Sequence, residues 1–213
     1  NTYESEFVIN ELKKAGYTIK DFEDCEYKVG ELPKKKDLLY FNGIGGFDEK
    51  KNEYVLYPSK DNLPPVPWAN VIANKNIGSV LTETGGGFSW LSNSREFRIT
   101  PWSNDTISDK RGEIIYIQDE KTGKLFNPYL LPCANDGFYE VKYGLGYAEY
   151  VSEIEGINSS LKIFIPVNDN VKISILKIKN NSEKKRELNI AYFVEPTLSY
   201  SSNGKEKYIK ASY

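Results

Sequence analysis

The feature that most constrains the fold of this chain is a series of short β-rich runs that begins at Leu38. About a dozen such runs follow one another, separated by turn chemistry such as EKTGK at 120–124, with no helical pattern between them. Strands in such a series pair into antiparallel sheets that must bury one face each. The sequence therefore predicts a mainly β fold, a large antiparallel sandwich of two sheets packed face to face.

The last runs of the series alternate apolar and polar residues over most of their length, as half-buried strands do. The alternation slips between Ile175 and Leu176, which predicts a bulge or a strand buried on both faces. The residues predicted to face inward are Leu161, Ile163, Ile165, Val171, Ile173, Leu188 and Ile190.

The N-terminal part differs from the rest. Apolar residues from Thr2 to Ala15 recur at helical spacing and stop at Gly16, which predicts one short helix. A proline- and lysine-containing linker follows. We therefore expect residues 1–37 to form a helix and linker arm, and residues 38–213 to form the sandwich domain. The chain has no methionine and ends in a strand-like run, so we expect it to be a fragment of a longer polypeptide.

Charge and composition exclude several functional classes. The 28 basic and 30 acidic residues nearly balance, which gives no reason to expect nucleic acid or an anionic membrane as a partner. The absence of histidine rules out Ser-His-Asp and Cys-His catalysis and removes the commonest transition-metal ligand. Cys25 and Cys133 lack metal-site spacing, so we expect unpaired thiols in a cytoplasmic protein, with neither metal nor cofactor.

The strongest candidate for a binding site is the segment Gly85–Asp105, GGGFSWLSNSREFRITPWSND. Its three glycines permit positive φ and a close approach of other groups. Tryptophan rings can stack on sugar rings, whereas amide and guanidinium groups bind hydroxyls or phosphate. The candidate substrate-binding residues are Trp90, Asn93, Arg95, Arg98, Trp102 and Asn104.

The same segment also has a purely structural interpretation. A β-hairpin would place both tryptophans in the core and pair Arg95 and Arg98 with local carboxylates such as Glu96 or Asp105. The high aromatic content, 14% of all residues, suits a sugar-binding surface or a large sandwich core equally well. Both interpretations stay open on the sequence alone.

Five segments carry a family resemblance. They are YFNGIGGFDEKKNEYVL at 40–56, PWANVIANKNIGSVLTETGGGFSWLSNSREFRITPWSNDTISD at 67–109, GEIIYIQDEKTGKLFNP at 112–128, YGLGYAEY at 143–150, and GINSSLKIFIPVNDNVKISILKIKNNSEKKRELNIAYFVEPTLS at 156–199. Together they resemble the N-terminal β-super-sandwich domain, galactose-mutarotase-like in fold, of glycoside hydrolase family 94, the cellobiose phosphorylase group. The motif SNSREFRITPWSND looks closer to the cyclic β-1,2-glucan synthase and β-1,2-oligoglucan phosphorylase branch.

The resemblance implies a parent enzyme that performs inverting phosphorolysis of β-glucosides, in which phosphate attacks and a carboxylic acid protonates the leaving oxygen. In the family that acid is an aspartate of a following (α/α)-barrel domain. No catalytic residue is therefore expected here, and the fragment alone is expected to be inactive. The implied partners are a β-glucan oligosaccharide and phosphate through the parent enzyme, the barrel domain of the same polypeptide, and a second copy in a homodimer.

Two other functions compete with this interpretation. A stand-alone carbohydrate-binding or assembly module would need no barrel domain. A sugar epimerase would follow from the mutarotase-like fold alone, but fold does not fix function, and the mutarotases that this fold resembles work with histidines. The zero histidine count disfavours the epimerase.

Overall fold

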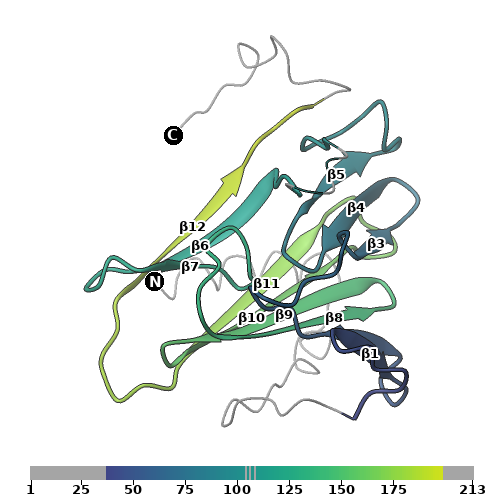
Figure 1. Cartoon of the computed structure of the whole chain (residues 1–213). Coiled ribbons are helices and arrows are strands. Elements are labelled where there is room, and N and C mark those ends of the chain that lie inside the picture. Colours follow the sequence, from purple (N-terminus) through teal and green to yellow (C-terminus); the bar gives the residue numbers. More distant parts are fainter. Residues whose placement is uncertain (1–36, 104, 106, 108, 199–213) are drawn as a thin grey trace, which may run out of the picture. The chain divides into compact units, whose positions relative to one another are not determined.

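The computed structural model describes residues 37–103, 105, 107 and 109–198, and all its regular elements are strands (Figure 1). The predicted helix at Thr2–Ala15 and Cys25 lie outside these residues. The strands are β1 Gly45–Asp48, β2 Glu53–Leu56, β3 Ala69–Ala73, β4 Ile77–Thr82, β5 Gly87–Leu91, β6 Glu113–Asp119, β7 Leu125–Phe126, β8 Phe138–Gly144, β9 Tyr147–Ile154, β10 Ile157–Phe164, β11 Ile173–Asn180 and β12 Leu188–Val194.

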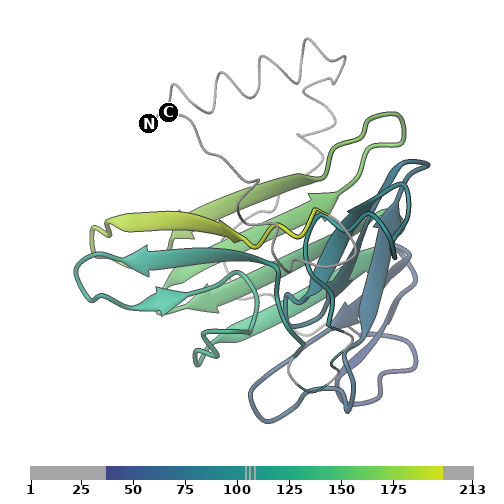
Figure 2. The same ribbon diagram turned by 90° about the horizontal axis from the view of Figure 1, so that it is seen from above.

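The strands form three antiparallel sheets. A six-stranded sheet has the order β1-β2-β8-β9-β10-β11, and two three-stranded sheets have the orders β12-β6-β7 and β3-β4-β5. In β8, β9 and β10 the register keeps alternate residues on one face, so that Val141, Tyr150 and Leu161 lie side by side. Figure 2 shows β6 and β12 as a layer separate from the six-stranded sheet.

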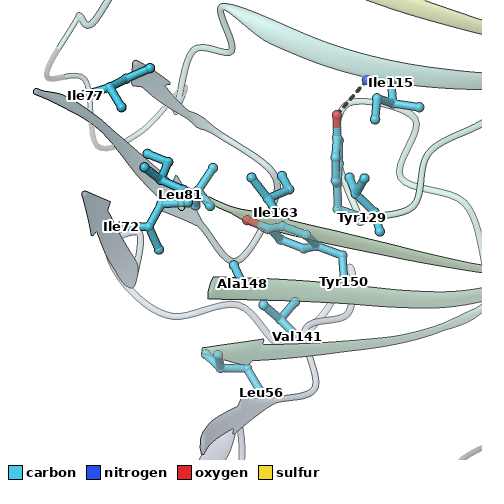
Figure 3. Close-up of a cluster of buried hydrophobic side chains, with 12 residues drawn as sticks. Leu56, Ile72, Ile77, Leu81, Ile115, Tyr129, Val141, Ala148, Tyr150 and Ile163 are labelled. Atoms are coloured by element: carbon cyan, nitrogen blue, oxygen red, sulfur yellow. Dashed lines mark hydrogen bonds between the residues drawn. The ribbon is translucent and has the colours of Figure 1, made fainter. Parts of the chain in front are cut away.

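Two hydrophobic clusters fill the space between these layers, the arrangement that defines a sandwich. The larger cluster joins the six-stranded sheet to both smaller sheets, and Figure 3 shows how its side chains converge. It contains Leu56, Ile72, Ile77, Leu81, Ile115, Tyr129, Val141, Ala148, Tyr150, Leu161, Ile163 and Ile165. The second joins β6 and β7 to β8–β10 through Ile117, Phe126, Leu130, Tyr139, Ile154 and Ile157. The predicted mainly β super-sandwich is confirmed, with the layer opposite the six-stranded sheet divided in two.

The predicted inward face is correct for β10 and wrong toward the sheet edges. Leu161, Ile163 and Ile165 are buried, Ile173 and Leu188 are half-buried, and Val171 and Ile190 are exposed. For β11 the reason is the phase of the strand: Leu176 pairs with Leu161, whereas Ile173 pairs with Phe164 and therefore lies on the opposite face. For β12 the reason is its position as the last strand of its sheet, where no further strand covers its outer side. A period-2 pattern identifies one face of a strand but not whether anything packs against it.

The predicted bulge in β11 is also absent. Leu176 pairs with Leu161 and Ile175 pairs with Lys162 in an uninterrupted register along the whole strand. Ile175 and Leu176 therefore point to opposite faces, and both are half-buried. The break in alternation at Ile175 and Leu176 therefore marks a strand that is partly covered on both faces, the alternative to a bulge.

Both faces of the central strands are covered. The face opposite the core carries charged side chains, and these are buried too. Lys142 Nζ lies 3.0 Å from Glu149 Oε2 and 3.2 Å from Glu140 Oε1, with Lys142 and Glu140 almost fully buried. Burial alone would lower the pKa of Lys142, but the two carboxylates outweigh it and raise that pKa. The buried ammonium and its two neighbours therefore form one ionic unit.

Candidate functional site

The candidate segment starts as a tight turn between β4 and β5, where three glycines meet other parts of the chain. Gly85 and Gly87 have positive φ, +88° and +122°. A Cβ on Gly87 would lie 1.9 Å from the carbonyl oxygen of Val80, and one on Gly86 would lie 2.3 Å from the Asp109 carboxylate. No side chain fits at these positions, so glycine is required for packing within the domain itself.

A cluster of polar side chains fixes this turn through hydrogen bonds. Asp109 Oδ2 accepts hydrogen bonds from the hydroxyls of Thr82 at 2.6 Å and Thr84 at 2.7 Å, and Arg111 donates to the Thr84 hydroxyl at 2.7 Å. The Thr82 hydroxyl oxygen in turn accepts the amide of Gly86 at 2.8 Å. The sequence analysis did not predict this cluster. The sequence features that could have indicated it are the two threonines before the glycines and the opposite charges near the end of the segment.

Glu83 is a buried carboxyl beside the same cluster. It is 2% exposed, and its Oε2 accepts the backbone N–H of Trp68 at 2.8 Å. Burial raises the pKa of Glu83 to about 7, and Asp109 adds to that effect while backbone hydrogen bonds and Arg111 oppose it. Because it is enclosed, Glu83 does not face a ligand on the outer side of the segment.

Trp90 lies on β5 and packs over its neighbour β4. Its ring covers Gly78, where a Cβ would lie 2.2 Å from the indole. It is only partly exposed, and it pairs across the segment with Arg98 in an isolated antiparallel bridge. Packing within the domain therefore explains the position of most of the Trp90 ring, in line with the structural interpretation.

Trp102 is placed differently, since a large part of its surface remains exposed. Its indole stacks on Phe88, with ring centroids 4.8 Å apart and planes 5° from parallel, yet Trp102 is 46% exposed. The Arg98 guanidinium lies 5.8 Å from the Trp102 ring centroid and 5.9 Å from that of Phe88, within range of a cation–π interaction. Trp102 and Arg98 thus form a joint aromatic and cationic surface.

Asn93 and Arg95 lie at the outer tip of the segment. The Asn93 Oδ1 accepts the backbone N–H groups of Arg95 at 2.8 Å and Glu96 at 3.0 Å, which fixes a turn. The Arg95 side chain is 77% exposed, and its Nε lies 3.4 Å from Glu96 Oε1. An exposed pair of this kind is weak, so the guanidinium stays accessible to a ligand.

Four of the six candidate residues fall into two groups, and Trp90 packs on β4 as described above. Arg98 and Trp102 are brought together, while Arg95 and Asn93 lie at the tip; Asn104 lies outside the described residues. Within the part of the chain that the structure describes, no three His, Cys, Asp or Glu residues are grouped as metal ligands. The same part contains no helix long and apolar enough to cross a membrane.

Both arms of the segment are tied to residues that flank other strands. Lys172, just before β11, forms an ion pair with Glu113 of β6 and donates to Ser89 of β5 at 2.7 Å. The amide of Thr197, just after β12, donates to the carbonyl of Ile99 at 2.8 Å. Lys172 therefore holds the outgoing arm at Ser89, and Thr197 holds the returning arm at Ile99.

Fold and segment together define an antiparallel β-super-sandwich domain with an aromatic and basic loop. The family described as glycosyl hydrolase 94, supersandwich domain, matches residues 52–210, which is most of the chain. The chain belongs to this family.

Similar proteins act on carbohydrates, as their names state. The chain is 32% identical over 160 residues to the cyclic beta-(1,2)-glucan synthase NdvB of Rhizobium meliloti, covering 75% of this chain and 6% of that protein. It is 26% identical over 172 residues to an N,N'-diacetylchitobiose phosphorylase of Vibrio furnissii, covering 79% and 21%. It is 30% identical over 159 residues to a solabiose phosphorylase of Paenibacillus borealis, covering 73% and 20%. The chain therefore spans about a fifth or less of the length of these relatives.

Proposed function

We propose that the chain is the non-catalytic β-sandwich domain of a carbohydrate phosphorylase or cyclic β-1,2-glucan synthase. In this proposal it supports an (α/α)-barrel domain that performs inverting phosphorolysis of β-glucosides, and it contributes to sugar binding and dimerisation. The observation that carries the proposal is the family match over 52–210 in a chain that covers only 6% to 21% of its relatives. The zero histidine count also fits a domain whose catalytic acid lies elsewhere.

The Gly85–Asp105 segment is the part that we propose reaches the sugar site. The exposed part of the Trp102 indole offers stacking, and Arg98 and Arg95 offer donors for hydroxyls or phosphate. The glycine turn and its polar cluster hold the start of the segment in place, so the exposed groups are positioned in advance.

Substitution in the full-length enzyme tests this role. Arg95→Ala or Arg98→Ala should lower kcat/KM at least about tenfold, or roughly 1.4 kcal/mol of transition-state binding, and leave the melting temperature nearly unchanged. Lys185→Ala serves as a control, because the Lys185 side chain is 83% exposed and lies outside the segment. A loss of stability with unchanged kinetics of the folded fraction would make the segment purely structural.

The isolated chain separates this proposal from the stand-alone binding module. We expect it to show neither phosphorolysis nor glycosyl transfer, and its loop to bind glucans no more tightly than about 1 mM. Release of glucose 1-phosphate by the pure chain, or micromolar binding that Trp102→Ala abolishes, would contradict the proposal.

A further inference from the structure

A groove lies where three parts of the sandwich meet, away from the Gly85–Asp105 segment. It has a volume of about 760 Å³ and is lined by the β1–β2 hairpin, the start of β3 and the tip of the β8–β9 hairpin. Within the sheet β3-β4-β5, the groove borders β3 whereas the candidate segment contains β5, so β4 separates them. A groove of this volume is large enough for a small organic ligand.

Aromatic rings make up the apolar part of the groove. Tyr54 contacts Phe47 edge to face at 4.8 Å between centroids and contacts Trp68 at 6.0 Å, and Tyr143 lines the same wall. Phe47 is 50% exposed, and Trp68 and Tyr54 are partly exposed, so ring surface is available to a ligand. Rings arranged in this way suit a ligand that has an apolar face.

Hydrogen bonds fix the walls in place. Tyr143 donates to the Trp68 carbonyl at 2.8 Å, and Asn70 Nδ2 donates to the Tyr147 carbonyl at 2.8 Å, which ties β3 to the β8–β9 hairpin. The Tyr147 hydroxyl donates to Glu53 Oε1, which ties the hairpin to β2. The groove is thus built before any ligand arrives, which reduces the entropic cost of binding.

Polar groups at the groove are amides and one carboxylate. Asn42, Asn52 and Asn70 line it, and no described residue donates to the amide oxygen of Asn70. Glu53 is the single carboxylate of the lining, which contains neither lysine nor arginine. Amides bind hydroxyl groups as donors and acceptors, whereas a lining without lysine or arginine offers no cation to hold phosphate or another anion.

We infer that this groove is a second carbohydrate site, which takes a neutral oligosaccharide of two or three pyranose units. The apolar face of a sugar ring would stack on the Phe47 and Trp68 side, and its hydroxyls would bind the asparagine amides. This goes beyond the proposed function, in which the Gly85–Asp105 segment serves the catalytic site. A groove of this kind would hold a glucan chain on the domain without taking part in its cleavage.

Two substitutions remove the ligand contacts with little effect on the fold. Asn52 has a φ of +53°, a value that favours glycine, so Asn52→Gly deletes the amide and keeps the turn. Phe47→Ala removes a half-exposed ring. Phe193→Ala is the matched control, because Phe193 is 46% exposed and lies on β12, outside the groove.

The test is an NMR titration of the 213-residue chain with β-1,2-glucotriose, cellotriose and glucose 1-phosphate. We expect either trisaccharide to shift the Trp68 indole N–H and the amides of Asn52 and Leu145, with a dissociation constant on the order of 1 mM, and glucose 1-phosphate to bind more weakly. Asn52→Gly and Phe47→Ala should each weaken binding at least about threefold, whereas Phe193→Ala and Trp102→Ala leave it unchanged.

Three results would overturn the inference. They are no shift with either trisaccharide at about 20 mM, shifts confined to Trp90 and Trp102, and equal weakening by Phe193→Ala. None of them bears on the kinetic test of Arg95 and Arg98 in the full-length enzyme, so the two proposals fail separately.

Discussion

The indole of Trp102 lies flat on the phenyl ring of Phe88, with centroids 4.8 Å apart and planes within 5° of each other. Phe88 is buried on β5, while Trp102 follows the tip of the candidate segment and is 46% exposed. One face of the indole therefore orders the segment, and much of the side chain stays exposed. This pairing supports the structural interpretation of Trp102 and is compatible with the ligand contact that we propose.

Replacing Trp102 with alanine should reveal the first of these roles. We expect the free energy of unfolding to fall by about 1 kcal/mol, because one aromatic pair is lost while Phe88 stays in the core. Trp102→Phe should retain most of that stability. Urea unfolding monitored by circular dichroism measures both, and a loss of about 4 kcal/mol for alanine would place the whole indole in the core.

Leu161 and Ile190 form a matched pair for testing the core. Leu161 is 1% exposed between the layers, so Leu161→Ala should lower the free energy of unfolding by roughly 2–5 kcal/mol. Ile190 is 57% exposed on β12, and Ile190→Ala should cost less than about 1 kcal/mol in the same chain. Equal losses in denaturant titrations would show that the outer side of β12 is covered in solution.

Lys142→Met tests the buried ionic unit on the other face of the six-stranded sheet. Removal of the ammonium leaves Glu140 and Glu149 buried without their cation, so we expect a loss of about 3–5 kcal/mol at pH 7. Lys142 lowers the pKa of Glu149 against the effect of burial, so this pair stabilises the fold above the ordinary pKa of 4.5 and less as pH falls. The cost of Lys142→Met, from unfolding curves at several pH values, should therefore shrink toward pH 4.

The stability contributed by Glu83 should depend on pH in the opposite direction to that of the Lys142–Glu149 pair, and Glu83→Gln tests this. The pKa of Glu83 rises from 4.5 to about 7, chiefly through burial, so the folded state favours the protonated acid. Wild-type stability from this group is complete below pH 4.5 and is lost as pH rises through 7, by on the order of 3 kcal/mol. Glutamine keeps an acceptor for the Trp68 N–H, so Glu83→Gln should be the more stable chain at pH 8. Thermal melts at pH 5 and 8 compare them, and equal stabilities at pH 8 would contradict a buried charged Glu83.

The strand series and the alternation within β10 predicted the sandwich correctly, because period-2 patterning reports directly on which side of a strand is apolar. The positions of Val171 and Ile190 could not be predicted in the same way. Val171 precedes β11, and the burial of Ile190 depends on strand order, which brings distant segments together and leaves β12 at the end of its sheet. Local sequence does not encode that order.

The candidate segment shows the same limit at the level of single residues. Composition singled out its tryptophans and arginines, but it could not separate Trp90, which packs over Gly78, from Trp102, which is 46% exposed. The Asp109 cluster could not be predicted because its members are far apart in the sequence, at the two ends of the segment, and only the fold brings them into contact. The groove at Trp68 could not be predicted for the same reason, because it forms only where the β1–β2 hairpin, the β8–β9 hairpin and the start of β3 meet.

The amide of Thr197 donates to the carbonyl of Ile99, and the amide of Glu195 donates to the carbonyl of Gly112, just before β6. Ile99 is the chain neighbour of Arg98 and lies three residues before Trp102. The position of the arm that carries these two side chains is therefore coupled to the position of the residues that follow β12.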